Sequence, residues 1–219
     1  MGLRKRLSVV ILLLLGVGGI SASALARSGG SPAVPMPKVT AAMIAAGKTY
    51  GISTAPIRID EYYDLECPHC QNLYLNTLLP LINQYVANGQ VYLVQHDFPL
   101  PMHTYAKEAA YLADAAAAIG KLEPVETSLF QHQDQWASTG NVFPFVAAVL
   151  SPTQAREVQE LAQTSLVHQA VQADINQGNA LGIDETPTMF ITYKGKRTPV
   201  IGDISYSILR GYLNAMLHQ

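Results

Sequence analysis

The two cysteines of this 219-residue chain lie three positions apart, in the segment Cys67-Pro68-His69-Cys70. Residues 57–63 before them alternate as a strand does, and the apolar residues after them recur at helical spacing. The sequence therefore predicts both thiols in the first turn of a helix that follows a strand. A disulfide across so short a loop restricts the unfolded chain little, so we interpret the pair as a reversible disulfide that exchanges with other molecules.

The predicted position of Cys67 favours a thiolate. Unpaired backbone N–H groups and the helix dipole at a helix N-terminus stabilise negative charge. Pro68 suits the first helical position, and His69 is a candidate cation or donor beside the sulfur. These effects lower the pKa of Cys67, and a stable thiolate leaves readily, which makes a disulfide oxidising. Cys70, one turn later, is then the predicted resolving thiol.

Other uses of a cysteine pair agree less well with the sequence. A zinc site needs about four ligands, of which one cysteine pair supplies two. Haem attachment requires a histidine directly after the second cysteine, where this chain has Gln71. We therefore expect no metal and no cofactor. A purely structural disulfide remains an alternative, although it explains neither Pro68 nor His69.

The first residues have the pattern of an export signal. Arg4, Lys5 and Arg6 precede an apolar run at 7–20, and the small residues at 24–26 fit a cleavage site. We predict a signal peptide at 1–26 and a protein that works in the periplasm or elsewhere outside the cytoplasm, where disulfides persist. The alternative is an uncleaved N-terminal membrane anchor, because about 20 uncharged residues span a bilayer.

The rest of the chain is predicted as a flexible N-terminal segment, 27–49, and one domain, 50–219. A short helix is predicted at 40–46, and a helical block occupies about 104–182 between two groups of strands. The order strand, helix, strand, helical block, strand, strand, helix indicates one mixed α/β domain with a helical insertion. The chain has a net charge of −2 and no basic patch, so we expect no nucleic-acid partner.

A second functional element, Thr186-Pro187, comes just before the third predicted strand. A cis bond between these two residues would turn the chain sharply and leave backbone groups free to pair with an extended substrate. Most bonds before proline are trans, so the segment becomes informative only together with the cysteine pair.

The combined pattern resembles the thioredoxin fold. The 116 residues between Cys70 and Pro187 are too many for thioredoxin itself and fit the helical insertion of the DsbA-like thiol-disulfide oxidoreductases. Residues 61–70 are close to the active-site segment of that family, and the resemblance covers roughly 50–219. It implies that Cys67 is the nucleophile, Cys70 the resolving thiol and Pro187 a cis-proline facing them.

The resemblance also assigns a role to Glu61, which matches an acidic residue beneath the family's active site that helps to move protons. The alternative for Glu61 is a solvated charge at the end of a strand. Substrates implied by the family are reduced or misoxidised exported proteins. The implied redox partner is a membrane protein such as DsbB or a VKOR-like protein.

The direction of the redox chemistry is the open question. Pro68-His69 matches the oxidase DsbA, whereas Thr186 is more like the isomerase-type members. Glu66 departs from the family pattern, and its charge is expected to raise the pKa of Cys67 and weaken the oxidant. We predict an exported oxidase, with an isomerase or reductase as the first alternative and a non-catalytic binding domain with a structural disulfide as the second.

The remaining candidates are assigned structural roles. His96 and His103 flank the proline-rich loop after the second predicted strand, and we interpret both as solvated or structural histidines. Trp136 is expected to pack within the helical block. A proline at position 80 is expected to kink the helix that begins at the cysteines.

Overall fold

A computed structural model of the chain describes residues 38–218. The predicted signal peptide at 1–26 lies outside the described residues, as does the part 27–37 of the predicted flexible segment. No helix within 38–218 has both the length and the apolar character that crossing a membrane requires.

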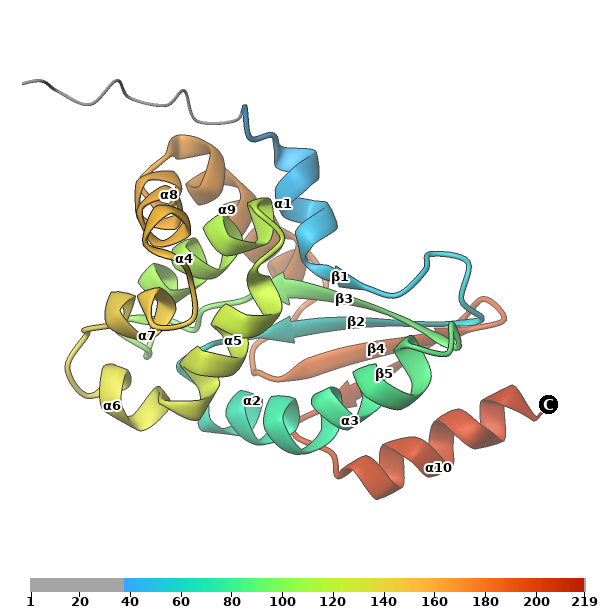
Figure 1. Ribbon diagram of the computed structural model, residues 1–219. Coiled ribbons are helices and arrows are strands. Elements are labelled where there is room, and N and C mark those ends of the chain that lie inside the picture. The colour runs from blue at the N-terminus through green and yellow to red at the C-terminus, as the bar shows by residue number, and fades with distance from the viewer. Residues whose placement is uncertain (1–37, 219) are drawn as a thin grey trace, which may run out of the picture. The chain divides into compact units, whose positions relative to one another are not determined.

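The centre of the domain is a five-stranded sheet with the strand order β1-β3-β2-β4-β5 (Figure 1). Strand β2 pairs in parallel with β3 and antiparallel with β4, so it has neighbours on both sides. Strands β1 and β5 pair antiparallel with β3 and β4 and form the two edges. The strands are β1 (Thr49–Tyr50), β2 (Ile57–Tyr63), β3 (Val91–Asp97), β4 (Thr188–Tyr193) and β5 (Lys196–Ile201). The central strand β2 leads directly to the cysteines.

Helices cover the sheet, and α4 to α9 gather at its left end in Figure 1. The first long helical stretch comprises α2 (Pro68–Leu73), η1 (Tyr74–Leu78), α3 (Leu79–Leu81) and η2 (Ile82–Val86). The insertion comprises α4 (Ala106–Ala118), α5 (Leu122–Gln131), α6 (Gln133–Ala137), α7 (Phe143–Ala147), α8 (Pro152–Ala162) and α9 (Ser165–Ala180). The outer helices are α1 (Ala41–Gly47) and α10 (Tyr206–Leu217). The predicted order of strands and helices is confirmed.

The helix around Pro80 continues, but its hydrogen bonding changes on both sides. Segments η1 and η2 are π-helical, and the three residues of α3 between them include Pro80. Proline has no N–H and its ring excludes the carbonyl four residues earlier, so the neighbouring turns adopt wider hydrogen bonds. The expected disturbance at Pro80 is therefore a local widening of the helix.

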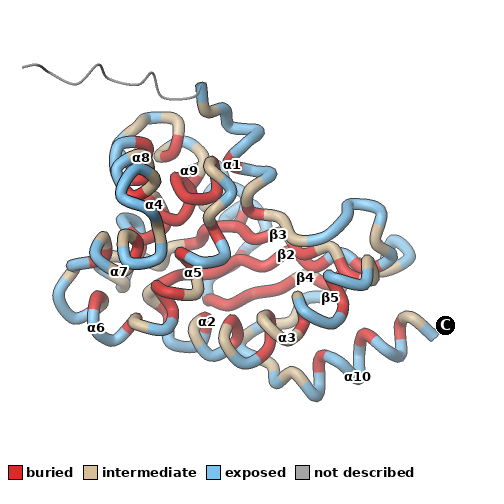
Figure 2. Tube along the Cα trace, in the orientation of Figure 1, coloured by how far each residue is buried: buried red, intermediate tan, exposed pale blue. Residues whose placement is uncertain are grey.

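Helix α4 is the centre of the insertion because its many alanines allow other helices to approach closely. It contacts α1, α5, α8 and α9. A Cβ atom at Gly47 would lie 2.0 Å from the carbonyl oxygen of Ala117, so α1 can meet α4 only through glycine. Residues 41–50 thus belong to the packed domain, which begins before position 50. The central strands are largely buried between the helices (Figure 2).

A buried group of charges connects the sheet to the insertion. The Lys48 ammonium lies 2.8 Å from an Asp97 oxygen and 2.9 Å from an Asp114 oxygen, and it also contacts Asp174 of α9. Lys48 lies between α1 and β1, whereas the carboxylates come from β3, α4 and α9. We call these four residues the lysine cluster. It joins the β1–β3 side of the sheet to two helices of the insertion.

Candidate active site

The two thiols lie where the sequence predicts them, at the junction of β2 with α2. Cys67 is the N-cap of α2 in an extended conformation, and Pro68 occupies the first helical position. Both cysteines are free thiols, Cys67 with 4% and Cys70 with 0% of its surface exposed. The side-chain amide of Gln133 in α6 donates to the carbonyl of Cys67 at 3.0 Å. The insertion therefore supports the active-site turn directly, a contact that no sequence pattern indicated.

The two thiols differ in acidity. The hydrogen bond from the Cys70 thiol is the largest effect that lowers the pKa of Cys67, to about 5, and it outweighs the opposing effect of burial. The backbone N–H groups of Cys70 and His69 add to it. Burial raises the pKa of Cys70 well above its ordinary value, and so does the neighbouring thiolate. At neutral pH the reduced site therefore has a thiolate at Cys67 and a proton on Cys70.

The Thr186–Pro187 segment lies against Cys67. The predicted cis bond between the two residues is present. The Cys67 sulfur lies 3.4 Å from the carbonyl oxygen of Thr186, which accepts a hydrogen bond from the thiol when Cys67 is protonated. The Thr186 hydroxyl is buried without a hydrogen-bond partner among the described residues, and it helps to lower the pKa of Cys67. A buried, unpartnered hydroxyl beside the sulfur is available as a donor to the thiolate.

The side chain of His69 contacts Asp203 and is exposed. Its Nδ1 lies 3.2 Å from a carboxylate oxygen of Asp203, which also accepts from the Asn72 amide at 2.6 Å. The imidazole is 68% exposed. His69 thus acts on Cys67 through its backbone N–H, and its side chain interacts with the loop before α10. The expectation of a cation beside the sulfur needs this correction.

Glu66 also differs from the expectation drawn from the sequence. Its carboxylate accepts a hydrogen bond from the backbone N–H of Tyr105 at 2.6 Å, at the start of α4. The pKa of Cys67 is lowered, and Glu66 is not among the largest effects on it. The carboxylate next to Cys67 in sequence therefore holds the insertion in place.

Asp64 organises the turn before the cysteines, although the sequence did not single it out. Its buried carboxylate accepts from the backbone N–H of Leu100 and contacts Nδ1 of His103, both at 2.7 Å. Its backbone N–H donates to the Cys70 sulfur at 3.4 Å. The pairing of His103 with Asp64 gives this histidine a structural role next to the active site. Two features of the sequence could have predicted this pair: the acid at Asp64, three residues before Cys67, and the histidine at His103, after the proline-rich loop.

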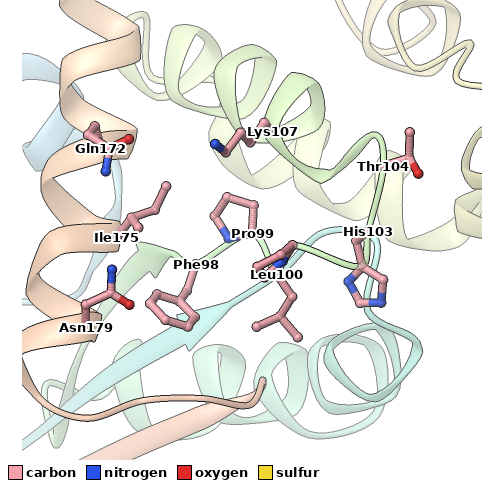
Figure 3. Close-up of a pocket in the computed structure, with 10 residues that line it drawn as sticks. Phe98, Pro99, Leu100, His103, Thr104, Lys107, Gln172, Ile175 and Asn179 are labelled. Carbon is pink, nitrogen blue, oxygen red and sulfur yellow. The ribbon is translucent and has the colours of Figure 1, made fainter.

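The loop held by Asp64 also lines a cavity of about 590 Å³ (Figure 3). Phe98 and Leu100 of the loop and Ile175 of α9 supply apolar walls, and His103 and Lys107 supply polar ones. The same loop thus contacts the active-site turn through Asp64 and borders a concave, partly apolar surface.

Glu61 is buried below the cysteines. The side chain has 1% of its surface exposed, so the alternative of a solvated charge is wrong. The Gln95 amide donates to it at 3.1 Å. Burial raises the pKa of Glu61 to about 7, although Gln95 and His96 act in the opposite direction. A negative charge on Glu61 in turn raises the pKa of Cys70. A carboxyl that titrates near neutral pH thus interacts with the resolving thiol.

Known proteins agree with this combination of fold and site. A family model described as Thioredoxin matches residues 45–210, most of the chain. The chain belongs to the thioredoxin family.

The crystal structure of alpha-DsbA1 from Wolbachia pipientis superposes with a TM-score of 0.66 at 20% identity and covers 84% of this chain and 93% of that one. BdbD from Bacillus subtilis gives a TM-score of 0.63 at 16% identity, over 78% of this chain and 93% of that one. The fold, including its helical insertion, is therefore that of the DsbA proteins.

Two curated relatives carry different names. The Na(+)/H(+) antiporter NhaA 1 of Mycolicibacterium gilvum (strain PYR-GCK) is 28% identical over 152 residues, 68% of this chain but 24% of the antiporter. The probable disulfide bond formation protein D of Bacillus anthracis is 20% identical over 149 residues, 66% of this chain and 69% of that protein. This chain thus spans about a quarter of the length of the antiporter it matches.

Proposed function

We propose that this protein is a thiol-disulfide oxidoreductase that donates its Cys67–Cys70 disulfide to protein dithiols outside the cytoplasm. The observation that carries the proposal is the difference between the two thiols. The pKa of Cys67 is lowered to about 5, and the pKa of Cys70 is raised. A thiolate this stable is a good leaving group, which favours transfer of the disulfide to the substrate.

The reaction proceeds by two exchanges. A substrate thiolate attacks Cys67, the Cys67–Cys70 bond breaks, and Cys70 leaves as a thiolate that takes up a proton. A second substrate thiolate then attacks the substrate sulfur of the mixed disulfide and releases Cys67 as a thiolate. Two electrons pass from the substrate dithiol to the enzyme, whose dithiol must afterwards be reoxidised.

The substrates in this proposal are reduced or misoxidised exported proteins, and the oxidant is a membrane protein of the DsbB or VKOR-like kind. The basic and apolar residues at the start of the sequence support export, with a membrane anchor as the alternative. The DsbA-type fold is consistent with this assignment. The antiporter's name supports no transport activity here, because the match covers only 24% of that protein.

Titration of the reduced protein tests the proposed direction. We expect the ultraviolet absorbance of the Cys67 thiolate to titrate near pH 5, well below the ~8.5 of free cysteine. Cys67→Ser should lose this transition, which assigns it to the correct thiol. A transition near the ordinary value would contradict an oxidase.

An isomerase or reductase is the second candidate, because Thr186 precedes the cis-proline as in the isomerase-type relatives. The two are separated by comparing the oxidation of a fully reduced protein with the reactivation of one whose disulfides are scrambled. An oxidase accelerates the first reaction far more than the second. If Cys67→Ser catalysed thiol oxidation as well as the unaltered chain, both enzymatic functions would be excluded in favour of a binding domain.

A further inference from the structure

A second buried carboxyl lies beside Glu61, on a different element of the fold. Glu126 belongs to α5 and is fully buried. A single nitrogen atom, Nε2 of Gln95, donates to Glu61 at 3.1 Å and to Glu126 at 2.7 Å. The Gln95 amide therefore bridges two carboxyl groups from β2 and α5. We call Glu61 and Glu126 the acid pair.

The acid pair is not neutralised by a cation. Within residues 38–218 no lysine, arginine or histidine forms an ion pair with either carboxyl. Two neighbouring carboxylates in a buried site cannot both ionise easily, so such a pair retains a proton. Burial raises the pKa of Glu126 well above its ordinary value, and the charge of Glu61 raises it further. The pair therefore retains a proton, and burial together with the charge of Glu61 favours the protonated form of Glu126.

The other titratable groups that act on the pair do not change this assignment. Among them only His96 can carry a positive charge, and it contacts Asp60 and Asp174. Aspartate and tyrosine side chains complete the surroundings: Tyr50, Tyr63, Tyr74 and Asp97. None of these four groups can carry a positive charge, so none neutralises a second carboxylate, although the hydrogen bond from Tyr50 lowers the pKa of Glu126.

The acid pair has a hydrogen bond to a half-buried residue, through Glu126. The Tyr50 hydroxyl donates to Glu126 at 3.2 Å, and Tyr50 is half-buried on the edge strand β1. Glu61, in contrast, has Gln95 as its hydrogen-bond partner among the described residues. Cys70 is also fully buried. A proton that leaves Cys70 for Glu61 therefore needs another group to reach solvent, and Glu126 is the adjacent one.

We infer that Glu126 is a further functional residue of the thiol exchange. It is a positioning residue: it exchanges protons with Glu61 and thereby acts on Cys70 through Glu61. The inference rests on the proposed exchange at Cys67 and Cys70. When Cys70 attacks the Cys67 sulfur of a mixed disulfide, its proton moves to Glu61, a new Cys67–Cys70 bond forms and the bound thiolate leaves. The proton on the acid pair then passes by Glu126 and Tyr50 to solvent.

The test measures one step that needs Cys70 and one that does not. A mixed disulfide of Cys67 with glutathione is formed with oxidised glutathione, and the rate at which Cys70 displaces the glutathione is followed against pH. We expect Glu126→Gln to slow this displacement about tenfold or more. Alkylation of the Cys67 thiolate, which needs no proton from Cys70, should keep its rate and its pH profile. Glu123→Gln, an exposed position on the same helix, is the matched control.

Further variants distinguish a proton pathway from a general structural effect. Glu61→Gln should slow displacement at least as much as Glu126→Gln, and the double variant should be no slower than Glu61→Gln, because the two groups act in series. Glu126→Asp should recover part of the rate. An infrared carbonyl band of a protonated carboxylic acid near neutral pH should disappear in Glu126→Gln.

Several results would overturn the inference. Displacement at the unaltered rate in Glu126→Gln would do so, as would equal slowing of displacement and of Cys67 alkylation. If Glu126→Gln does not fold, Tyr50→Phe decides, since it removes only the hydroxyl of a half-buried residue, and an unchanged displacement rate there counts against the pathway. An unaltered chain that forms no mixed disulfide would contradict the proposed function itself.

Discussion

The lysine cluster and the acid pair are both groups of buried carboxyls, and they differ in what lies between the carboxyls. In the lysine cluster an ammonium lies between Asp97, Asp114 and Asp174. In the acid pair a neutral amide occupies the corresponding place between Glu61 and Glu126. Both groups join the sheet to the helical insertion, so they do not differ in location. They differ in whether a positive charge lies between the carboxyls.

The contrast separates structural from functional acids. Burial alone would lower the pKa of Lys48, but the surrounding carboxylates outweigh it and raise that pKa well above its ordinary value. The ammonium is thus permanently charged and holds the elements together. The acid pair has no such charge, and burial raises the pKa of Glu61 to about 7. Glu61 can therefore exchange its proton near neutral pH, whereas the Lys48 ammonium stays charged.

The largest expected effect comes from removing the cation of the lysine cluster. Lys48→Met leaves the carboxyl groups of Asp97, Asp114 and Asp174 in a buried site without the cation that they share. We expect a loss of about 3–5 kcal/mol in the free energy of unfolding, which is typical of a buried ion pair with one partner removed. Urea denaturation at neutral pH measures it, and Lys107→Met, an exposed lysine, is the control. A loss below about 1 kcal/mol would show that the cluster contributes little.

The acid pair should have the opposite effect, because here the charge itself is unfavourable. The pKa of Glu61 is about 7 in the folded chain and about 4.3 when unfolded. The unfolded state therefore binds fewer protons between these values, and stability falls as pH rises through them. We expect Glu61→Gln to remove a decline on the order of 3 kcal/mol between pH 4 and pH 8.

Denaturation curves across that pH range measure this effect for Glu61→Gln and the unaltered chain. Glu160→Gln, an exposed glutamate on α8, should leave the decline in place. If the unaltered chain and Glu61→Gln have parallel profiles, Glu61 is ionised in the fold at neutral pH, and the contrast with the lysine cluster disappears.

The two groups also show how far sequence reasoning reaches. Cys67 and Cys70 were predictable because a local pattern specifies their place, a strand followed by a helix N-terminus. The cis bond before Pro187 was predictable only from the cysteine pair and the family resemblance together. The partners Gln95 and Glu126 lie 31 residues apart, and no periodicity relates them. Only the packing of α5 against the sheet brings them together.

Side-chain direction was the other source of error. Glu66 and His69 were judged by their distance in sequence from Cys67, which suggested that both charges act on its sulfur. In the structure the Glu66 carboxylate binds the start of α4, and the His69 ring binds Asp203. Neighbouring residues at the start of a helix point in different directions, so adjacency in sequence does not establish contact between side chains.

The smallest expected effect concerns His96, which extends the lysine cluster across the sheet. Its ring nitrogens lie 3.1 Å from Asp60 and 3.3 Å from Asp174. Burial opposes the charged form, but the hydrogen bonds to Asp174 and Asp60 outweigh it and raise the pKa of His96. The charged imidazole of His96 therefore stabilises the fold. This stabilisation is fully present below the pKa of histidine in the unfolded chain, about 6.5, and it is lost as pH rises through the pKa of His96 in the folded chain.

We therefore expect His96→Asn to destabilise the chain by about 1–2 kcal/mol more at pH 5 than at pH 9, the scale of hydrogen bonds to charged groups. Denaturation at the two pH values measures the difference, and His218→Asn, at an exposed position, should show none. A loss that is equal at both values would mean that His96 is neutral in the fold. The cation at this end of the lysine cluster would then be Lys48 alone, and the ring would contribute through its stacking on Tyr62, with ring centres 4.5 Å apart.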